Sequence, residues 1–141
     1  MSKQIDPRGP RFGAGITTIM LAIILLTIPS SVALVLLVIQ TAAFALGAFV
    51  GLHAQPYGRI YRKFVASRLQ PPTELEAVEP PTFAQLVGFF FAAIGLVALI
   101  AGATTVATIA VGLALAAAFL NAAFGICLGC EMYVIGKRIF S

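Results

Sequence analysis

The sequence predicts an all-α integral membrane protein, a four-helix transmembrane bundle built from a duplicated helical hairpin. Three observations predict this fold: a strongly apolar composition, four long apolar segments, and a second half that repeats the pattern of the first. Of 141 residues, 60% are hydrophobic and 10% are charged, and the mean hydropathy is +1.03. Soluble domains are far less apolar. The whole chain, residues 1–141, is therefore expected to form a single membrane domain.

Each apolar segment approaches or reaches the ~20 residues that a helix needs to cross a bilayer. The segments are residues 13–28, 32–53, 83–101 and 105–127. Basic residues precede the first segment, as they do in a signal peptide. However, no small-x-small cleavage pattern follows that segment, and the next one begins almost at once. The sequence therefore predicts four membrane spans.

The basic residues predict the orientation of these spans. All nine lie in the N-terminal tail, the middle loop and the C-terminal tail: Lys3, Arg8, Arg11, Arg59, Arg62, Lys63, Arg68, Lys137 and Arg138. The two remaining turns, near residues 29–31 and 102–104, carry no charge. The positive-inside rule then places both termini and the middle loop in the cytoplasm. Anionic lipid head groups account for the net charge of +4 without a nucleic acid partner.

The second half of the chain repeats the first at one constant spacing. The first half has A-A-F at residues 42–44, followed by Phe49, Arg62 and Lys63. The second half has A-A-F at residues 117–119, followed by Phe124, Lys137 and Arg138. We expect repeat 1 to cover about residues 6–64 and repeat 2 about residues 79–140, as in other internally repeated membrane proteins. Because each repeat crosses twice, both copies have the same orientation.

The segment between the repeats has two parts. Apolar and aromatic residues recur at helical spacing over residues 57–69, with basic residues on the other side. This pattern predicts an amphipathic helix on the cytoplasmic membrane surface. Residues 70–82 are rich in proline and glutamate, which predicts a solvated linker because proline interrupts helices.

The sequence C-L-G-C-E contains both cysteines of the chain, Cys127 and Cys130. It lies where the fourth apolar segment ends and charged residues begin with Glu131. Cysteines at this spacing can form a disulfide, bind a metal as a bidentate arm or pack as small apolar side chains. At the matched positions the first half carries Leu52 and Gln55. The dithiol therefore belongs to one repeat only. We take Cys127, Cys130 and Glu131 as the candidate catalytic residues and predict no metal site.

Two further polar residues are expected at the depth of the cysteines. His53 and Gln85 can complete a pocket at the cytoplasmic rim with the C-L-G-C-E motif. If the fourth helix continues to Lys137, the cysteines lie near a helix C-terminus, where carbonyl oxygens disfavour a thiolate. Gly129 is the expected place for a break that lets the sulfurs meet. Gln40, within the second span, is expected to make an interhelical hydrogen bond.

Several motifs resemble one bacterial membrane family, catalogued as domain of unknown function forty-three ninety-five. They are D-P-R-G-P-R-F-G at the N-terminus, A-F-A-L-G-A-F with P-Y-G in the middle, and F-L-N-A-A-F-G-I-C-L-G-C-E-M-Y near the end. The layout is also similar to DoxX-like membrane proteins. The resemblance implies a small four-span protein of the bacterial cytoplasmic membrane. It also implies that, in some genomes, neighbouring genes encode thioredoxin-like and rhodanese-like proteins, which points to thiol or sulfane-sulfur chemistry.

The leading functional hypothesis is a membrane-embedded dithiol protein that exchanges disulfide or sulfane sulfur with a cytoplasmic thioredoxin-like or sulfurtransferase-like partner. Cys130 is then the attacked or attacking sulfur and Cys127 the resolving one. One alternative is a small transporter or channel subunit for a sulfur-containing anion or a metal ion. A structural membrane anchor with inert cysteines is the other. No cofactor signature is present, and enzymatic activity and homo-oligomer formation stay open on the sequence alone.

Overall fold

The computed structural model describes residues 4–5, 8–51, 55–65, 76–77, 79–124 and 128–140. Most of these residues are helical. The exceptions are the turn residues 28–30, 51, 55 and 101–103 and the strand β1 (Gln4–Ile5), which pairs antiparallel with β2 (Glu76–Ala77). The first half contains α1 (Arg8–Thr27), α2 (Ser31–Ala45), the π-helical turn η1 (Leu46–Val50), α3 (Pro56–Ile60) and the π-helical turn η3 (Tyr61–Val65). The second half contains α4 (Glu79–Ile100), α5 (Thr104–Phe124) and α6 (Leu128–Phe140).

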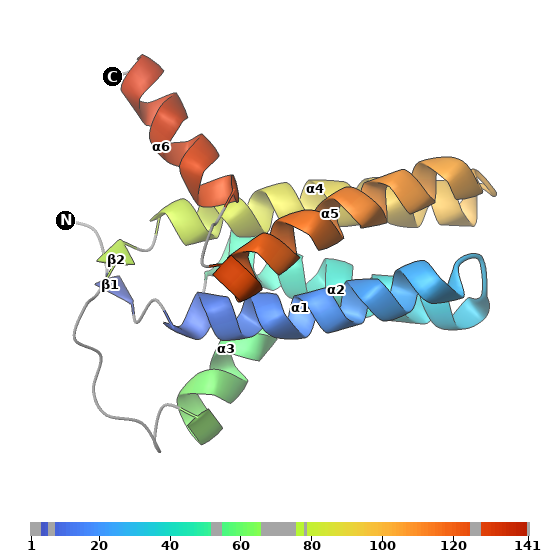
Figure 1. Cartoon of the computed structure of the whole chain (residues 1–141), viewed down its shortest axis with the longest axis horizontal. Coiled ribbons are helices and arrows are strands. Elements are labelled where there is room, and N and C mark those ends of the chain that lie inside the picture. The colour runs from blue at the N-terminus through green and yellow to red at the C-terminus, as the bar shows by residue number, and fades with distance from the viewer. Residues whose placement is uncertain are drawn as a thin grey trace.

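Four long helices, α1, α2, α4 and α5, lie side by side as a bundle (Figure 1). α1 packs against α2 and α5, and α4 packs against the same two helices. The helices therefore form a ring in which each hairpin contacts the other along two sides. The all-α fold class predicted from the sequence is confirmed for the described residues, apart from the short strand pair.

Within the part of the chain that the structure describes, three helical segments are long and apolar enough to cross a membrane: Ser31–Val50, Pro81–Ile100 and Thr104–Phe124. The apolar part of α1, Arg11–Thr27, is shorter. At 1.5 Å per residue, the 21 residues of α5 extend about 31 Å, which matches the hydrocarbon thickness of a bilayer. The chain is therefore a membrane protein by the length and composition of its helices.

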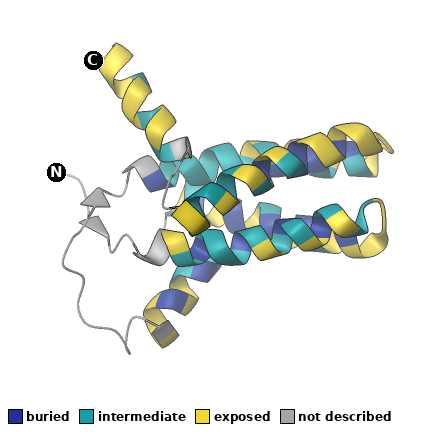
Figure 2. Ribbon diagram, viewed as in Figure 1, coloured by how far each residue is buried: buried dark blue, intermediate teal, exposed yellow. Residues whose placement is uncertain are grey.

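The outer faces of the bundle are apolar as well as the inner ones. A small core is buried between the helices and includes Leu21, Ile24, Leu37 and Val111. Large apolar side chains also point outward, and Leu26 is 85% exposed. Figure 2 shows such exposed positions along the outer sides of the long helices. Helices that are apolar all round suit a lipid environment, where the outer side chains contact acyl chains instead of water.

At the uncharged side of the bundle, local sequence signals mark where one helix of each hairpin stops and the next begins. Ser30 caps α2, and its side-chain oxygen accepts a hydrogen bond from the Ala33 amide. Gly102 follows α4 with a φ of 83°, a left-handed conformation that favours glycine after a helix. The amide of Ala103 then donates to the Ala98 carbonyl over 2.7 Å. The turns between α1 and α2 and between α4 and α5 are therefore defined by the residues that the sequence places there.

The third span begins earlier than the sequence pattern indicated. α4 begins at Glu79, inside the segment assigned to the linker, and Pro80 and Pro81 occupy its first turn. Proline is tolerated there because the first amides of a helix have no intrahelical partner. An acidic and proline-rich composition is therefore compatible with the first turn of a helix and does not by itself indicate a linker.

Candidate functional site

The fourth apolar segment and the residues up to Lys137 belong to two helices, so the condition that would place the cysteines near a helix C-terminus is not met. α5 ends at Phe124 and α6 begins at Leu128, and α6 leaves the bundle at a steep angle (Figure 1). α5 already has the length of a full span, and the residues that follow bring charges that are costly in hydrocarbon. The axis of α6 therefore differs from that of α5 (Figure 1). The expectation that Gly129 marks the break is wrong, because Gly129 lies within α6.

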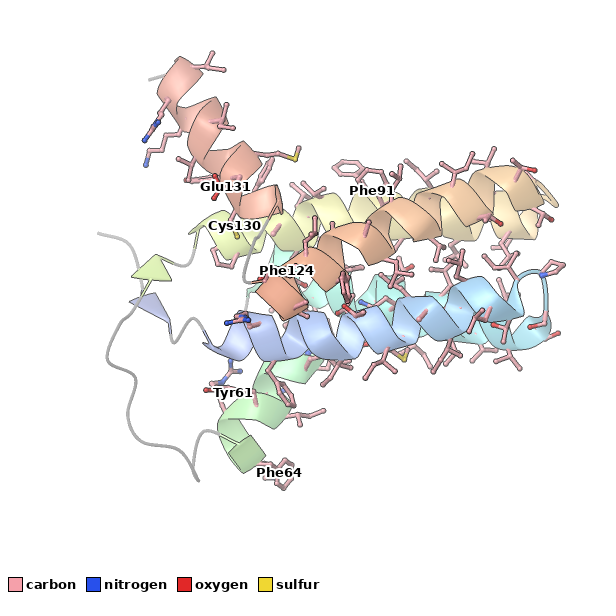
Figure 3. The ribbon with its side chains drawn as sticks, viewed as in Figure 1. Tyr61, Phe64, Phe91, Phe124, Cys130 and Glu131 are labelled. Atoms are coloured by element: carbon pink, nitrogen blue, oxygen red, sulfur yellow. The ribbon has the colours of Figure 1, made fainter. Side chains whose placement is uncertain are left out.

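Cys130 lies in the first turn of α6, at the end of the bundle where α6 departs (Figure 3). It is half-buried, and its sulfur is in a disulfide. Cys127, the other cysteine of the sequence, lies outside the described residues. The thiol at Cys130 is therefore in its oxidised form at the boundary between an apolar span and a charged helix.

This position reverses the electrostatic expectation drawn from the sequence. Cys130 lies in the first turn of α6 and not near the C-terminus of a long helix, so the nearby end of the helix carries partial positive instead of partial negative charge. The partial positive charge of a helix N-terminus favours a thiolate. Glu131, the next residue, is exposed in the same turn, and its charge opposes part of that effect. The first turn of α6 therefore places Cys130 next to partial positive charge from the helix and next to the negative charge of Glu131.

An aromatic contact fixes α6 against the bundle. α6 packs on α4, and the ring centroids of Tyr133 and Phe83 are 5.8 Å apart. Tyr133 follows Cys130 by three positions, so it lies on a neighbouring face of the same helix. Aromatic pairs at such distances add to the stabilisation from buried area. The first turn of α6 is therefore held at a defined place on the rim.

Gln85 lies inside the bundle, next to the first repeat. A Cβ atom on Gly47 of η1 would lie 2.7 Å from Gln85 Oε1 and 3.0 Å from Gln55 Cγ. Gly47 therefore allows the two glutamines to approach, because any larger residue would displace one of them. The sequence predicts a rim pocket that contains Gln85, His53 and the C-L-G-C-E motif. Cys130 and Glu131 are neighbours on α6, whereas His53 and Cys127 lie outside the described residues.

The second buried polar contact joins the second span to the segment after it. The Tyr57 hydroxyl donates to Gln40 Oε1 over 2.7 Å, and Gln40 is completely buried. Burial raises the pKa of the Tyr57 phenol above its ordinary value of 10.0, since it penalises the charged form. The phenol therefore stays a hydrogen-bond donor at physiological pH. The interhelical hydrogen bond expected for Gln40 is confirmed.

Two buried polar atoms near this rim have no hydrogen-bond partner among the described residues. They are Nε2 of Gln40 and Oε1 of Gln85. Gln55 is satisfied, because its side-chain oxygen accepts from the Gly58 amide over 2.8 Å and caps α3. The interior of the bundle thus carries unpaired amide groups, which is costly in a low dielectric.

Sequence reasoning missed the role of Tyr57 and the structural position of Gln55. Tyr57 was assigned to the lipid-facing side of a surface helix, but it is buried against the bundle. Gln55 matches Cys130 at the repeat spacing, and each residue lies at the start of the helix that leaves the bundle. The repeat spacing was the signal that could have placed Gln55.

The metal alternative finds no ligand cluster within the part of the chain that the structure describes. No group of three histidine, cysteine, aspartate or glutamate side chains converges there. A zinc site ordinarily needs at least three protein ligands. His53 and Cys127, which the metal alternative would combine with Cys130, lie outside the described residues.

Comparison with known proteins gives one match. A family model described as Domain of unknown function (DUF4395) matches residues 5–138. No curated protein and no solved structure matches the chain. The match covers almost all of the sequence and includes both halves and the C-L-G-C-E motif.

Proposed function

The chain belongs to the family described as Domain of unknown function (DUF4395), and from its own residues we propose that it is a membrane-embedded dithiol protein. It exchanges disulfide or sulfane sulfur with a cytoplasmic thioredoxin-like or rhodanese-like partner. The disulfide state of Cys130 at the start of α6 carries this proposal. Since Cys127 is the other cysteine in the sequence, we assign the disulfide to the pair Cys127 and Cys130.

The exchange step balances with a dithiol partner alone. A partner thiolate attacks the Cys130 sulfur, the bond between the two sulfurs breaks, and Cys127 leaves as a thiolate. The second partner thiolate then attacks the sulfur of the first partner cysteine in the mixed disulfide, which forms the partner's disulfide and releases Cys130 as a thiolate. The partner is oxidised by two electrons and the Cys127–Cys130 disulfide is reduced. The reverse reaction with an oxidised partner restores the starting state.

The sulfane-sulfur form of the reaction starts from the reduced pair. The Cys130 thiolate takes the outer sulfur of a partner persulfide, and the partner leaves as a thiolate. Cys127 then attacks the inner sulfur of the Cys130 persulfide, which forms the disulfide and releases hydrosulfide. This second step oxidises the two cysteines and reduces the transferred sulfur, so no further oxidant is needed.

The position of α6 supports the assignment of these roles. Cys127 directly precedes Leu128, the first residue of α6. A leaving thiolate there is stabilised by the helix N-terminus, and a leaving thiol with a lower pKa leaves faster. Cys130 is only half-buried, so a partner can reach its sulfur from the rim.

The proposal includes four spans with both termini in the cytoplasm of a bacterial inner membrane. α3 with η3 and α6 leave the same end of the bundle (Figure 1), and their exposed basic residues are Arg59, Arg62, Lys63, Lys137 and Arg138. The turns at the other end are uncharged. The positive-inside rule supports a cytoplasmic location for the basic end, where thioredoxin-like partners are available to Cys130.

Acid-quenched alkylation of the full-length protein in its native membrane tests the dithiol reaction. Mass spectrometry counts the labelled thiols before and after exposure to a mild oxidant or to a reduced dithiol. We expect Cys127 and Cys130 to change together between two labels and none. We also expect Cys127→Ala to retain a mixed disulfide between Cys130 and an oxidised cytoplasmic partner, because in this direction Cys127 is the thiol that attacks Cys130 and releases the partner.

The matched variant Cys130→Ala separates this reaction from its alternatives. It is expected to form no such adduct, because the Cys130 sulfur is absent. If the wild-type cysteines stay in one oxidation state under both treatments, the exchange proposal is wrong. A permanent disulfide or two inert thiols then favour the structural anchor, and anion or metal-ion flux in proteoliposomes would favour the transporter.

A further inference from the structure

α6 presents three chemically different faces. Tyr133 faces α4 through its contact with Phe83. Three large apolar residues, Met132, Ile135 and Ile139, are exposed on a second side. Their spacing of three and four positions places them on one stripe of the helix. The charged side chains of Glu131, Lys137 and Arg138 are exposed on the remaining arc. An exposed apolar stripe beside charges is typical of a helix that lies at an interface.

α3 and η3 carry the same arrangement. Tyr61 is buried, and its ring centroid lies 5.6 Å from that of Phe12 in α1. Ile60 and Phe64 are exposed, 43% and 58% respectively. The basic side chains Arg59, Arg62 and Lys63 are exposed as well, and Lys63 Nζ lies 5.5 Å from the centre of the Phe64 ring. This segment is therefore fixed to the bundle by tyrosines and turns apolar and basic groups outward.

The two segments match at the repeat spacing. Ile60 and Phe64 correspond to Ile135 and Ile139, since 135 − 60 and 139 − 64 both equal 75. At the same spacing, Arg62 and Lys63 correspond to Lys137 and Arg138. Each half thus places an exposed apolar pair and an adjacent basic pair outside the bundle. The two segments leave the bundle at the same end and in different directions (Figure 1).

The ends of the spans set the depth of both segments. The apolar segment Thr104–Phe124 ends shortly before α6, and Ser31–Val50 ends shortly before α3. A helix that follows a span so closely and turns away from its axis lies near the head groups of the adjacent leaflet. The interfacial region there accepts apolar side chains on one side of a helix and attracts basic side chains when the lipids are anionic.

We propose that α6 and α3 with η3 are two lipid-binding surfaces, one from each half, that insert into one leaflet and bind its anionic lipids. Ile135 and Ile139 of α6 enter the acyl region, as Ile60 and Phe64 do for the other half. Lys137 and Arg138 contact head-group phosphates. Charge complementarity selects an anionic lipid surface over a neutral one, and the closeness of the spans places that surface against both helices.

Tryptophan reporters test this proposal directly, because the chain contains no tryptophan. Full-length Ile135→Trp and Phe64→Trp proteins are reconstituted into vesicles of phosphatidylcholine with or without phosphatidylglycerol. Fluorescence quenching is compared for lipids brominated at shallow and at deep acyl positions, and for iodide in the water. An interfacial helix lies about 5–10 Å into the head-group and acyl boundary. We therefore expect the strongest quenching from shallow bromines and little from iodide.

Two control positions show how strongly a tryptophan is quenched deep in the bilayer and in water. Leu113→Trp in the middle of α5 should respond to deep bromines, because Leu113 is exposed on a span. Val134→Trp on the charged arc of α6 should respond more to iodide than Ile135→Trp does. Ile139→Trp provides a second reporter on the apolar stripe if Ile135→Trp does not fold. Strong iodide quenching at both Ile135 and Ile139 overturns the insertion of α6.

The role of lipid charge has its own measurement. In anionic vesicles, replacing Lys137 and Arg138 by glutamine should lower the shallow quenching of Ile135→Trp to its level in neutral vesicles. Equal quenching in both vesicle types, with no effect of these substitutions, overturns anionic lipid binding. Protection that depends on the ratio of protein to lipid would assign the surface to a second copy of the chain, which also overturns the proposal.

Discussion

At the scale of single residues, the hydrogen bond between Tyr57 and Gln40 holds α3 against α2. Both side chains are buried, and the distance between the Tyr57 hydroxyl and Gln40 Oε1 is 2.7 Å. Gln40 Nε2 already lacks a partner among the described residues. Tyr57→Phe should therefore lower the free energy of unfolding by about 1–3 kcal/mol, because it leaves a second group of Gln40 unsatisfied. Thermal unfolding in detergent measures the effect.

The double variant separates this hydrogen bond from simple packing. Replacing both partners, Tyr57→Phe with Gln40→Leu, removes the unsatisfied amide as well as its donor. The double variant should then be at least as stable as Tyr57→Phe alone, with clear non-additivity between the two changes. Additive losses of stability would mean that the two side chains act independently.

Part of this site could be predicted from the residues and part could not. A single amide within an apolar span predicts an interhelical hydrogen bond, and Gln40 makes one. The choice of partner was not predictable, because residues 57, 60, 61 and 64 all fall on one broad apolar side. Periodicity finds that side but does not tell which half of it meets the bundle. The structure buries Tyr57 and Tyr61 and exposes Ile60 and Phe64.

At the scale of elements, the crossing of α2 and α4 depends on a glycine. A Cβ atom on Gly88 would lie 2.5–2.8 Å from atoms of the Phe44 ring. Phe44 is itself buried in the core, so its ring has little room to move. Gly88→Ala should therefore destabilise the bundle by about 1–3 kcal/mol through overpacking, measured by thermal unfolding in detergent.

Gly112→Ala is the matched control for that prediction. Gly112 lies in α5, and a Cβ atom there would meet nothing within 4 Å. The control should be neutral or stabilising by up to about 1 kcal/mol, because alanine favours a helix more than glycine does. Equal effects of the two substitutions would contradict the role assigned to the contact with Phe44.

The sequence predicted a helix break near the cysteines but placed it at Gly129, which lies within α6. Gly125, Ile126 and Cys127 are small or apolar, so a hydropathy pattern runs through them without interruption. Hydropathy measures preference for lipid and carries no information about the direction of the helix axis. The length of α5 and the charges after Glu131 contained the signal, since a helix that is already long enough to span does not continue straight into charge. The start of α6 then inverts the electrostatic setting of Cys130.

At the scale of the whole molecule, the element order of one half repeats in the other. Two long helices are followed by a short amphipathic segment, first as α1, α2 and α3 with η3, then as α4, α5 and α6. The duplication itself stays a prediction from the sequence spacing. The core draws on both halves, because Leu21 and Leu37 of the first half pack with Ala92 and Val111 of the second. Neither hairpin buries its inner face alone.

A polar contact also joins the two halves at the basic end. The Arg11 guanidinium donates to the Ala122 carbonyl over 3.3 Å. Ala122 lies in the last turn of α5, where carbonyls lack intrahelical partners and cations are favoured. The α1 and α5 helices are thus joined by packing along their length and by one charged hydrogen bond near the rim.

The two halves should therefore assemble from separate chains. Residues 1–72 and 73–141, co-expressed in one membrane with an affinity tag on the first, should purify together, because the α1–α5 and α2–α4 contacts form without a covalent link. Gly88→Ala in the second chain should reduce the recovered amount, whereas Gly112→Ala should not. Recovery of the tagged half alone would show that the interfaces between hairpins do not hold the bundle. Recovery of both chains also requires that the two hairpins have the same orientation in the membrane, because Arg11 of α1 must lie next to Ala122 of α5. The experiment therefore tests packing and topology together.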